Sequence, residues 1–113
     1  MNSPPLGSDL TARCREIILA WSQLSALADF AERGHGYGSD GGGIRYPEDI
    51  DEYERVVEGV QIPEGFLQLY SYSQNDVLVP RSIYLRALMD VLANAGFAGD
   101  MARIQVLLSH ESP

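Results

Sequence analysis

The chain has 113 residues, a formal net charge of −8 and one cysteine. Its apolar share of 45% is typical of a folded domain, and a single cysteine excludes an internal disulfide. All eight basic residues are arginine, which excludes chemistry that needs a lysine, such as P-loop phosphate binding or a Schiff base. The acidic balance argues against nucleic acid or an anionic membrane as a direct partner. A reducing, cytoplasmic location is the simplest expectation.

Residues 1–8 are expected to form a flexible leader, and residues 9–113 a single domain. The segment 9–33 is predicted to be one long amphipathic helix that ends at Gly34, because its apolar residues recur at alternating spacings of four and three. These residues are Leu10, Cys14, Ile17, Ile18, Trp21, Leu24, Leu27, Ala28 and Ala31. On this stripe Cys14 is interpreted as a small core residue rather than a nucleophile.

Residues 34–43 include six glycines and are predicted to form a loop. Part of this loop, Gly36–Gly41, matches the G-x-G-x-x-G spacing of dinucleotide-binding proteins. That mechanism needs a strand before the glycines and a helix directly after them, and neither is expected here. The segment is therefore interpreted as a linker or a partner-contact loop, not as a nucleotide site.

Pro47 is placed to begin a helix that ends at Gly59, with Ile50, Tyr53 and Val57 expected to face the core. A turn over residues 62–65 then leads into a predicted β-hairpin, with strands at 66–72 and 77–79.

Pro80 opens a second strong helix, which Gly96 closes, and Asp100 can cap a short last helix. Residues 104–108 also fit a strand. The predicted fold is therefore α+β, with three to four helices packed on a small antiparallel β-hairpin or three-stranded sheet.

Metal and catalytic sites find little support in the sequence. The soft metal ligands are Cys14, His35 and His110, fewer than the four that a structural zinc site needs. No calcium-binding loop pattern and no G-x-S-x-G nucleophile motif occurs. Carboxylate pairs are too common in this chain to mark an acid–base site. We therefore expect a non-enzymatic protein with no metal, no cofactor and no catalytic residue.

An acidic segment in the middle of the chain is the main functional cue. From Asp40 to Glu64 there are eight acidic residues and two arginines, a net charge of −6. Such a segment can serve solubility alone, or it can dock a basic protein partner by electrostatic attraction. The expected partner-binding charges are Glu48, Asp49, Asp51, Glu52, Glu54, Arg55 and Glu58. The expected aromatic anchors are Tyr37, Tyr46, Tyr53, Tyr70 and Tyr72.

The stretch Ile62–Tyr70, with Val79–Pro80, Tyr84–Leu85 and Leu92–Gly96, resembles small acidic bacterial immunity proteins of polymorphic (contact-dependent) toxin systems. The resemblance rests on turn and core residues, so it transfers no site residue. It implies an inhibitor that binds a basic toxin domain. The alternative is a structural or adaptor domain that forms a homodimer through the apolar stripe of residues 10–31.

Overall fold

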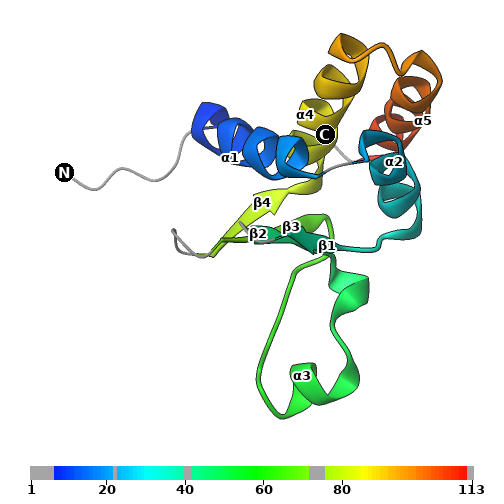
Figure 1. Cartoon of the computed structure of the whole chain (residues 1–113). Helices are drawn as coiled ribbons and strands as arrows, with labels where there is room; N and C mark the ends of the chain where they lie inside the picture. The colour runs from blue at the N-terminus through cyan, green and yellow to red at the C-terminus, as the bar shows by residue number, and fades with distance from the viewer. Residues whose placement is uncertain (1–6, 22, 40–41, 72–75, 112–113) are drawn as a thin grey trace.

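Five α-helices and a four-stranded antiparallel sheet form the part of the chain that the structure describes (Figure 1). This computed structural model describes residues 7–21, 23–39, 42–71 and 76–111. The helices are α1 (Gly7–Ala20), α2 (Leu24–Arg33), α3 (Glu52–Val56), α4 (Arg81–Asn94) and α5 (Ala98–Ser109), and a 3₁₀ turn, η1, spans Pro47–Asp49. The strands are β1 (Tyr37–Ser39), β2 (Gly42–Arg45), β3 (Phe66–Ser71) and β4 (Val77–Pro80). The α+β class is confirmed, but the described residues form five helices and four strands where three to four helices and a hairpin or three-stranded sheet were predicted.

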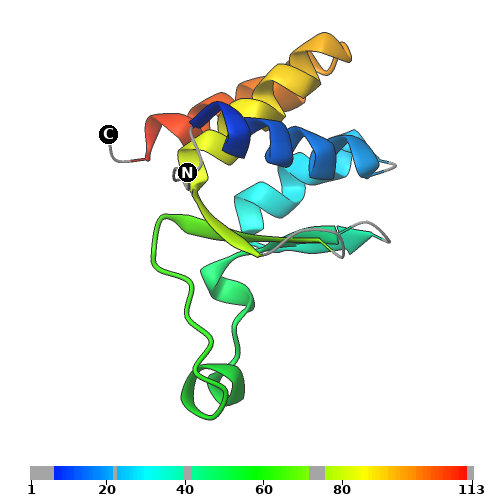
Figure 2. The same cartoon turned by 90° about the vertical axis from the view of Figure 1, so that its left-hand side faces the viewer.

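The molecule has two layers, with α1, α2, α4 and α5 covering one face of the sheet (Figure 2). The strands follow the order β1-β2-β3-β4, and Leu69 of β3 pairs with Ile44 of β2. Alternation along β3 turns the fully buried Leu67 and Leu69 toward the helices. Gln68 and Tyr70 therefore point to the opposite face. On that face the chain between β2 and β3 projects away from the sheet (Figure 1).

The core lies between the sheet and the four covering helices. The predicted apolar stripe is buried as expected, since Cys14, Ile18, Leu27 and Ala28 have no exposed surface. Burial raises the pKa of the Cys14 thiol to about 12, which fits its predicted role as a core residue. The most deeply buried residues of this stripe pack inside one copy of the chain, whereas Leu10, Ile17, Trp21 and Leu24 are only partly buried. The homodimer alternative stays a prediction.

The predicted helix over 9–33 is two helices. Helix α1 ends at Ala20 and α2 begins at Leu24. The break lets α1 pack against α4 while α2 packs against α5, and the apolar residues of both still reach one core. The end of α2 follows the prediction, because Gly34 adopts a left-handed φ of 64°. Helix α1 already includes Gly7, so part of the predicted leader is helical, and residues 1–6 lie outside the described residues.

The predicted glycine-rich loop contains a β-hairpin, because β1 and β2 pair within it. Glycine is required at position 43 because the backbone of Tyr37 and the side chain of Tyr70 leave no room for a Cβ. A Cβ on Gly43 would overlap the carbonyl oxygen of Tyr37 and lie 2.6 Å from the hydroxyl of Tyr70. Sheet pairing and the Tyr70 contact thus outweigh the entropy that glycine loses in a strand. Tyr37–Ser39 and Gly42–Arg45 are strands, so the helix that a dinucleotide-binding G-x-G-x-x-G segment requires does not follow these glycines.

The remaining predicted elements are close to the structure. Strands β3 and β4 form the expected hairpin, and the turn before them is shifted by one residue, with the N–H of Phe66 donating to Pro63 O at 3.1 Å and Gly65 at φ 86°. Helix α4 follows Pro80 as predicted. Residues 104–108 belong to helix α5, so the strand alternative for them is wrong.

Candidate functional site

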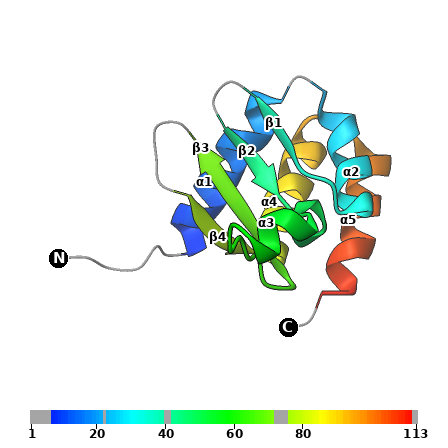
Figure 3. The same ribbon diagram turned by 90° about the horizontal axis from the view of Figure 1, so that it is seen from below.

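The acidic segment forms an arm that projects from the sheet on the side away from the helices (Figure 1, Figure 3). We define the acidic arm as residues 46–65, the connection between β2 and β3. It carries seven acidic residues and one arginine, so its net charge is −6. All the charged residues predicted to bind a partner lie on it. The arm therefore carries most of the net negative charge of the chain on a projection.

The arm is not the single helix predicted from Pro47 onward. Two short helical turns, η1 and α3, are separated by Ile50 in an extended conformation. Asp51 begins the second turn as an N-cap, since its Oδ1 accepts from the backbone N–H of Glu54 at 2.7 Å. The backbone N–H of Val60 donates to the Glu54 carbonyl at 3.0 Å and closes the turn. The role of Asp51 is thus to shape the arm.

Asp49 fastens the base of the arm to the sheet. Its Oδ2 accepts from the backbone N–H groups of Gly36 and Tyr46, each at 2.8 Å. Its Oδ1 lies 3.5 Å from Nδ1 of His35. The glycine at position 36 is needed for this contact, because a Cβ there would lie 2.6 Å from Oδ2. Asp49 is therefore engaged within the chain and does not offer a free carboxylate to a partner.

Three more of the predicted contact residues are also engaged within the chain. The Glu54 carboxylate pairs with Arg45 of β2 at 2.5 Å. Arg55 donates to the carbonyl of Ile50 at 3.4 Å. Glu48 lies 3.7 Å from Nη2 of Arg81, the first residue of α4. These contacts tie the arm to β2 and to the start of α4, and they join Arg55 to Ile50 within the arm.

The far end of the arm exposes apolar side chains beside free carboxylates. We define the tip as Glu52, Tyr53, Val56, Val57 and Glu58. Tyr53, Val56 and Val57 are 63%, 73% and 63% exposed. Glu52 and Glu58 are exposed and make no ion pair with any residue that the structure describes.

The expectation that Tyr53 and Val57 face the core is therefore wrong, whereas Ile50 is 6% exposed as predicted. Helix α3 lies beyond the reach of the core because the arm carries it away from the sheet (Figure 2). Val56 was missed as a candidate, since its place in a mixed apolar and acidic run gives no signal of exposure.

Two of the predicted aromatic anchors are buried. Tyr37 and Tyr46 are 8% and 1% exposed, so the prediction that they contact a partner is wrong. The Tyr37 hydroxyl lies 2.8 Å from the hydroxyl of Tyr84, and burial raises the pKa of all three phenols. The guanidinium of Arg81 lies 5.4 Å from the centre of the Tyr46 ring. These tyrosines join the sheet to the helices.

Tyr70 lies half-buried on the uncovered face of the sheet, and Tyr72 lies outside the described residues. On the same strand face Phe66 is 36% exposed, and Leu78 of β4 is 41% exposed. Phe66 immediately follows the arm in the chain. The uncovered sheet face thus adds moderately apolar surface near the base of the arm (Figure 3).

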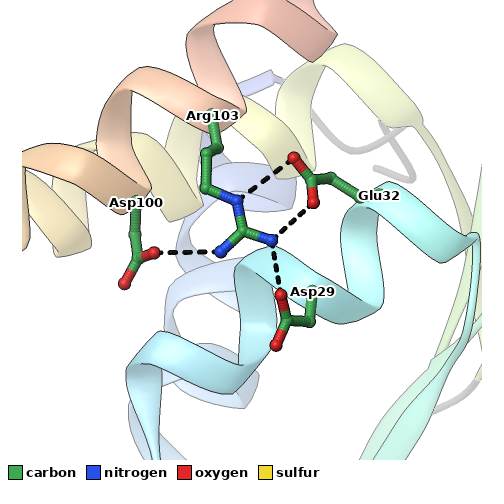
Figure 4. A network of polar contacts seen from close by, with 4 residues as sticks. All are labelled: Asp29, Glu32, Asp100 and Arg103. Carbon is green, nitrogen blue, oxygen red and sulfur yellow. Dashed lines mark hydrogen bonds and ion pairs between the residues drawn. The ribbon is translucent and has the colours of Figure 1, made fainter.

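A second charged cluster joins α2 to α5 (Figure 4). Arg103 pairs with Asp29, with Glu32 at 2.5 Å and with Asp100 at 3.1 Å. Hydrogen bonds from Arg103 lower the pKa of the Asp29 and Glu32 carboxyls. These carboxylates are compensated by Arg103, unlike Glu52 and Glu58. The cluster has the form of a structural clamp between two helices.

Within the described ranges, no three His, Cys, Asp or Glu side chains come together in a way that could hold a metal ion. The same ranges contain no helix with the length and apolar character required to cross a bilayer. The acidic arm with its apolar tip is therefore the candidate site that the geometry distinguishes. Comparisons of the chain with protein-family models, curated proteins and solved structures found no match.

Proposed function

We propose that this protein is a non-enzymatic binding module that docks a basic protein partner through the acidic arm. The observation that carries the proposal is the tip, where Tyr53, Val56 and Val57 are exposed next to the free carboxylates of Glu52 and Glu58. A few residues, often aromatic ones such as tyrosine, supply most of the affinity at protein interfaces. Surrounding charge supplies steering and selection of the partner. The tip offers both on one projection.

The apolar side chains argue against a role in solubility alone. Charged residues alone are sufficient for solubility, and exposed apolar surface opposes it. Each Å² of apolar surface left in water costs about 25 cal/mol relative to burial. Three such side chains lie together on a turn of only five residues, Glu52–Val56, and the residue after it. Their cost in the free protein is offset if a partner covers them.

The charge of the arm supports a basic partner. Its net charge of −6 lies on 20 residues, a density that attracts a basic surface over roughly 8–10 Å at physiological salt. Charge of this kind raises the association rate, whereas the apolar contacts slow dissociation.

We further propose that the binding is of the immunity type, in which the arm masks a basic surface of a toxin domain in the cytoplasm. The resemblance of the segment from Ile62 to Gly96 to acidic immunity proteins supports this more specific role. A projecting arm also suits insertion into a concave basic cleft, where it would exclude the toxin's substrate.

Affinity capture from lysate tests the docking function. The wild-type chain, a Tyr53→Ser/Val57→Ser variant and a Val106→Ser variant are used as bait. Val106 is a matched control because it is 57% exposed on α5, away from the arm. We expect a basic protein to be captured by the wild type and the control and lost with the tip variant. The same basic protein retained by all three baits contradicts the proposal.

Growth assays test the immunity role separately. The captured protein, expressed alone, is expected to arrest growth, and co-expression of the wild-type chain is expected to restore it. The Tyr53→Ser/Val57→Ser variant should fail to restore growth. If the captured protein is harmless, or if the tip variant protects as well as the wild type, the immunity role is wrong.

A further inference from the structure

The two sides of the acidic arm enclose a groove of about 610 Å³ that is separate from the tip. Its apolar lining includes Ile50 and Ile62, which are 6% and 9% exposed, and the half-buried Val60. Tyr53, Val56 and Val57 do not line it. A partner that contacts only the tip would therefore leave the apolar surface of the groove uncovered.

The rim of this groove is negative. Glu48 and Glu64 line it, and both are exposed. Glu64 forms no ion pair with the residues that the structure describes, and the carboxylate of Glu48 approaches Arg81 only to 3.7 Å with 56% of its side chain exposed. Arg55 also lines the groove, but its guanidinium is directed to the Ile50 carbonyl. The charged residues of the lining are thus two glutamates and one arginine, a net charge of −1 beside the apolar side chains.

We propose that this groove receives an arginine or lysine side chain of the basic partner. The aliphatic part of that side chain would lie on Ile50, Val60 and Ile62, and its charged end would reach Glu48 and Glu64. This inference rests on the proposed function, because it names which part of the basic partner the arm recognises.

The physical chemistry of the groove selects this occupant. Long basic side chains combine an apolar stem with a charged end, which matches an apolar lining under a carboxylate rim. A purely apolar side chain would cover the rim carboxylates without pairing them, and an acidic one would be repelled. Charge-assisted hydrogen bonds to carboxylates favour the cation further.

Methyl NMR on the full chain tests the groove with a defined probe. Acetyl-Gly-Arg-Gly-amide is titrated at low salt, and the isosteric citrulline peptide is the uncharged control. We expect saturable shifts of the Ile50, Val60 and Ile62 methyl groups with the arginine peptide alone. Glu64→Gln and Glu48→Gln should each raise the Kd about fivefold, as expected for one lost partly exposed charge pair. Glu16→Gln, an exposed charge on α1, should leave the Kd unchanged.

Equal shifts with the citrulline peptide, or an unchanged Kd in both Glu64→Gln and Glu48→Gln, would overturn the assignment. Shifts confined to the Val56 and Val57 methyl groups would also overturn it, and the docking function of the tip would still stand. Lysate capture with tip variants alters no groove residue. The groove and the docking function can therefore fail independently.

Discussion

At the scale of the residue, the partners of a carboxylate determine what it does. Asp49 and Glu58 belong to the same acidic run, yet Asp49 accepts two backbone N–H groups and Glu58 is exposed. The sequence could locate the run but could not separate these two roles. The N–H groups that bind Asp49 come from Gly36 and Tyr46, and the first of them is 13 positions away. Only the fold brings Gly36 to Asp49.

Replacing Asp49 is expected to destabilise the fold. Asp49→Ala leaves two partly buried N–H groups without an acceptor, which should lower the free energy of unfolding by about 1–3 kcal/mol. Asp49→Asn keeps an acceptor oxygen and should lower the free energy of unfolding by less than Asp49→Ala does. Urea denaturation followed by circular dichroism measures both. Glu58→Ala is the control, expected within about 0.5 kcal/mol of wild type; an equal loss in Glu58→Ala and Asp49→Ala would contradict the role of Asp49.

The Arg103 cluster makes a pH-dependent contribution to stability. The pKa values of Asp29 and Glu32 are lowered from 3.8 and 4.5 in the folded state, so their stabilisation is complete above about pH 5. It is lost as the pH falls through the lowered folded-state pKa values. We expect the Tm of the wild type to exceed that of Arg103→Met by a constant amount above pH 5. That difference should shrink steadily at lower pH, and a difference that does not change with pH would contradict the role of Arg103.

The Cys14 thiol is expected to be unreactive in the folded protein. It is fully buried, and burial raises its pKa to about 12, so the thiolate is scarce at pH 8. Ellman's reagent should detect no fast-reacting thiol in the native protein and one thiol per chain in denaturing urea. Fast labelling of the native protein at pH 8 would show that Cys14 is accessible.

At the scale of the element, the sequence correctly predicted the helices and strands that depend on a local pattern of residues. Helices α4 and α5 and the β3–β4 hairpin follow from apolar periodicity and from Pro80 and Gly96. The break between α1 and α2 was missed because the apolar stripe continues through Trp21 and Leu24 without a glycine or proline. The β1–β2 hairpin was missed because its glycines are required by Tyr70, a residue remote in sequence.

The hairpin glycines give a direct test of that explanation. Gly43→Ala places a Cβ against the Tyr37 carbonyl and the Tyr70 hydroxyl, and it should reduce stability by about 1–3 kcal/mol. Gly99→Ala, in α5, meets no atom within 4 Å and should be neutral or stabilising by up to about 1 kcal/mol. Thermal unfolding of the two variants compares them. A Gly43→Ala variant as stable as the wild type would rule out the close approach.

At the scale of the whole molecule, the helices and the sheet form a scaffold from which the acidic arm projects (Figure 2). The sequence predicted where the charge lies, because composition is local. It placed Tyr53 and Val57 in the core, because helical spacing alone cannot reveal that the chain around a helix leads away from the core. Exposure of the tip is a property of the complete fold, and it is the basis for the proposed binding role.

Removing the outer part of the arm, which includes the tip, tests the central claim most directly. Residues 51–60 are replaced by a short Gly-Ser linker, which preserves Asp49 and its two hydrogen bonds. The replacement also removes the partly exposed Arg45–Glu54 ion pair, which should lower the free energy of unfolding by about 0–1 kcal/mol. The Tm should therefore fall by only a few degrees. The affinity of this variant for the captured basic partner is the decisive measurement. We predict a folded protein that no longer binds; a folded variant that binds as tightly as the wild type would contradict the account.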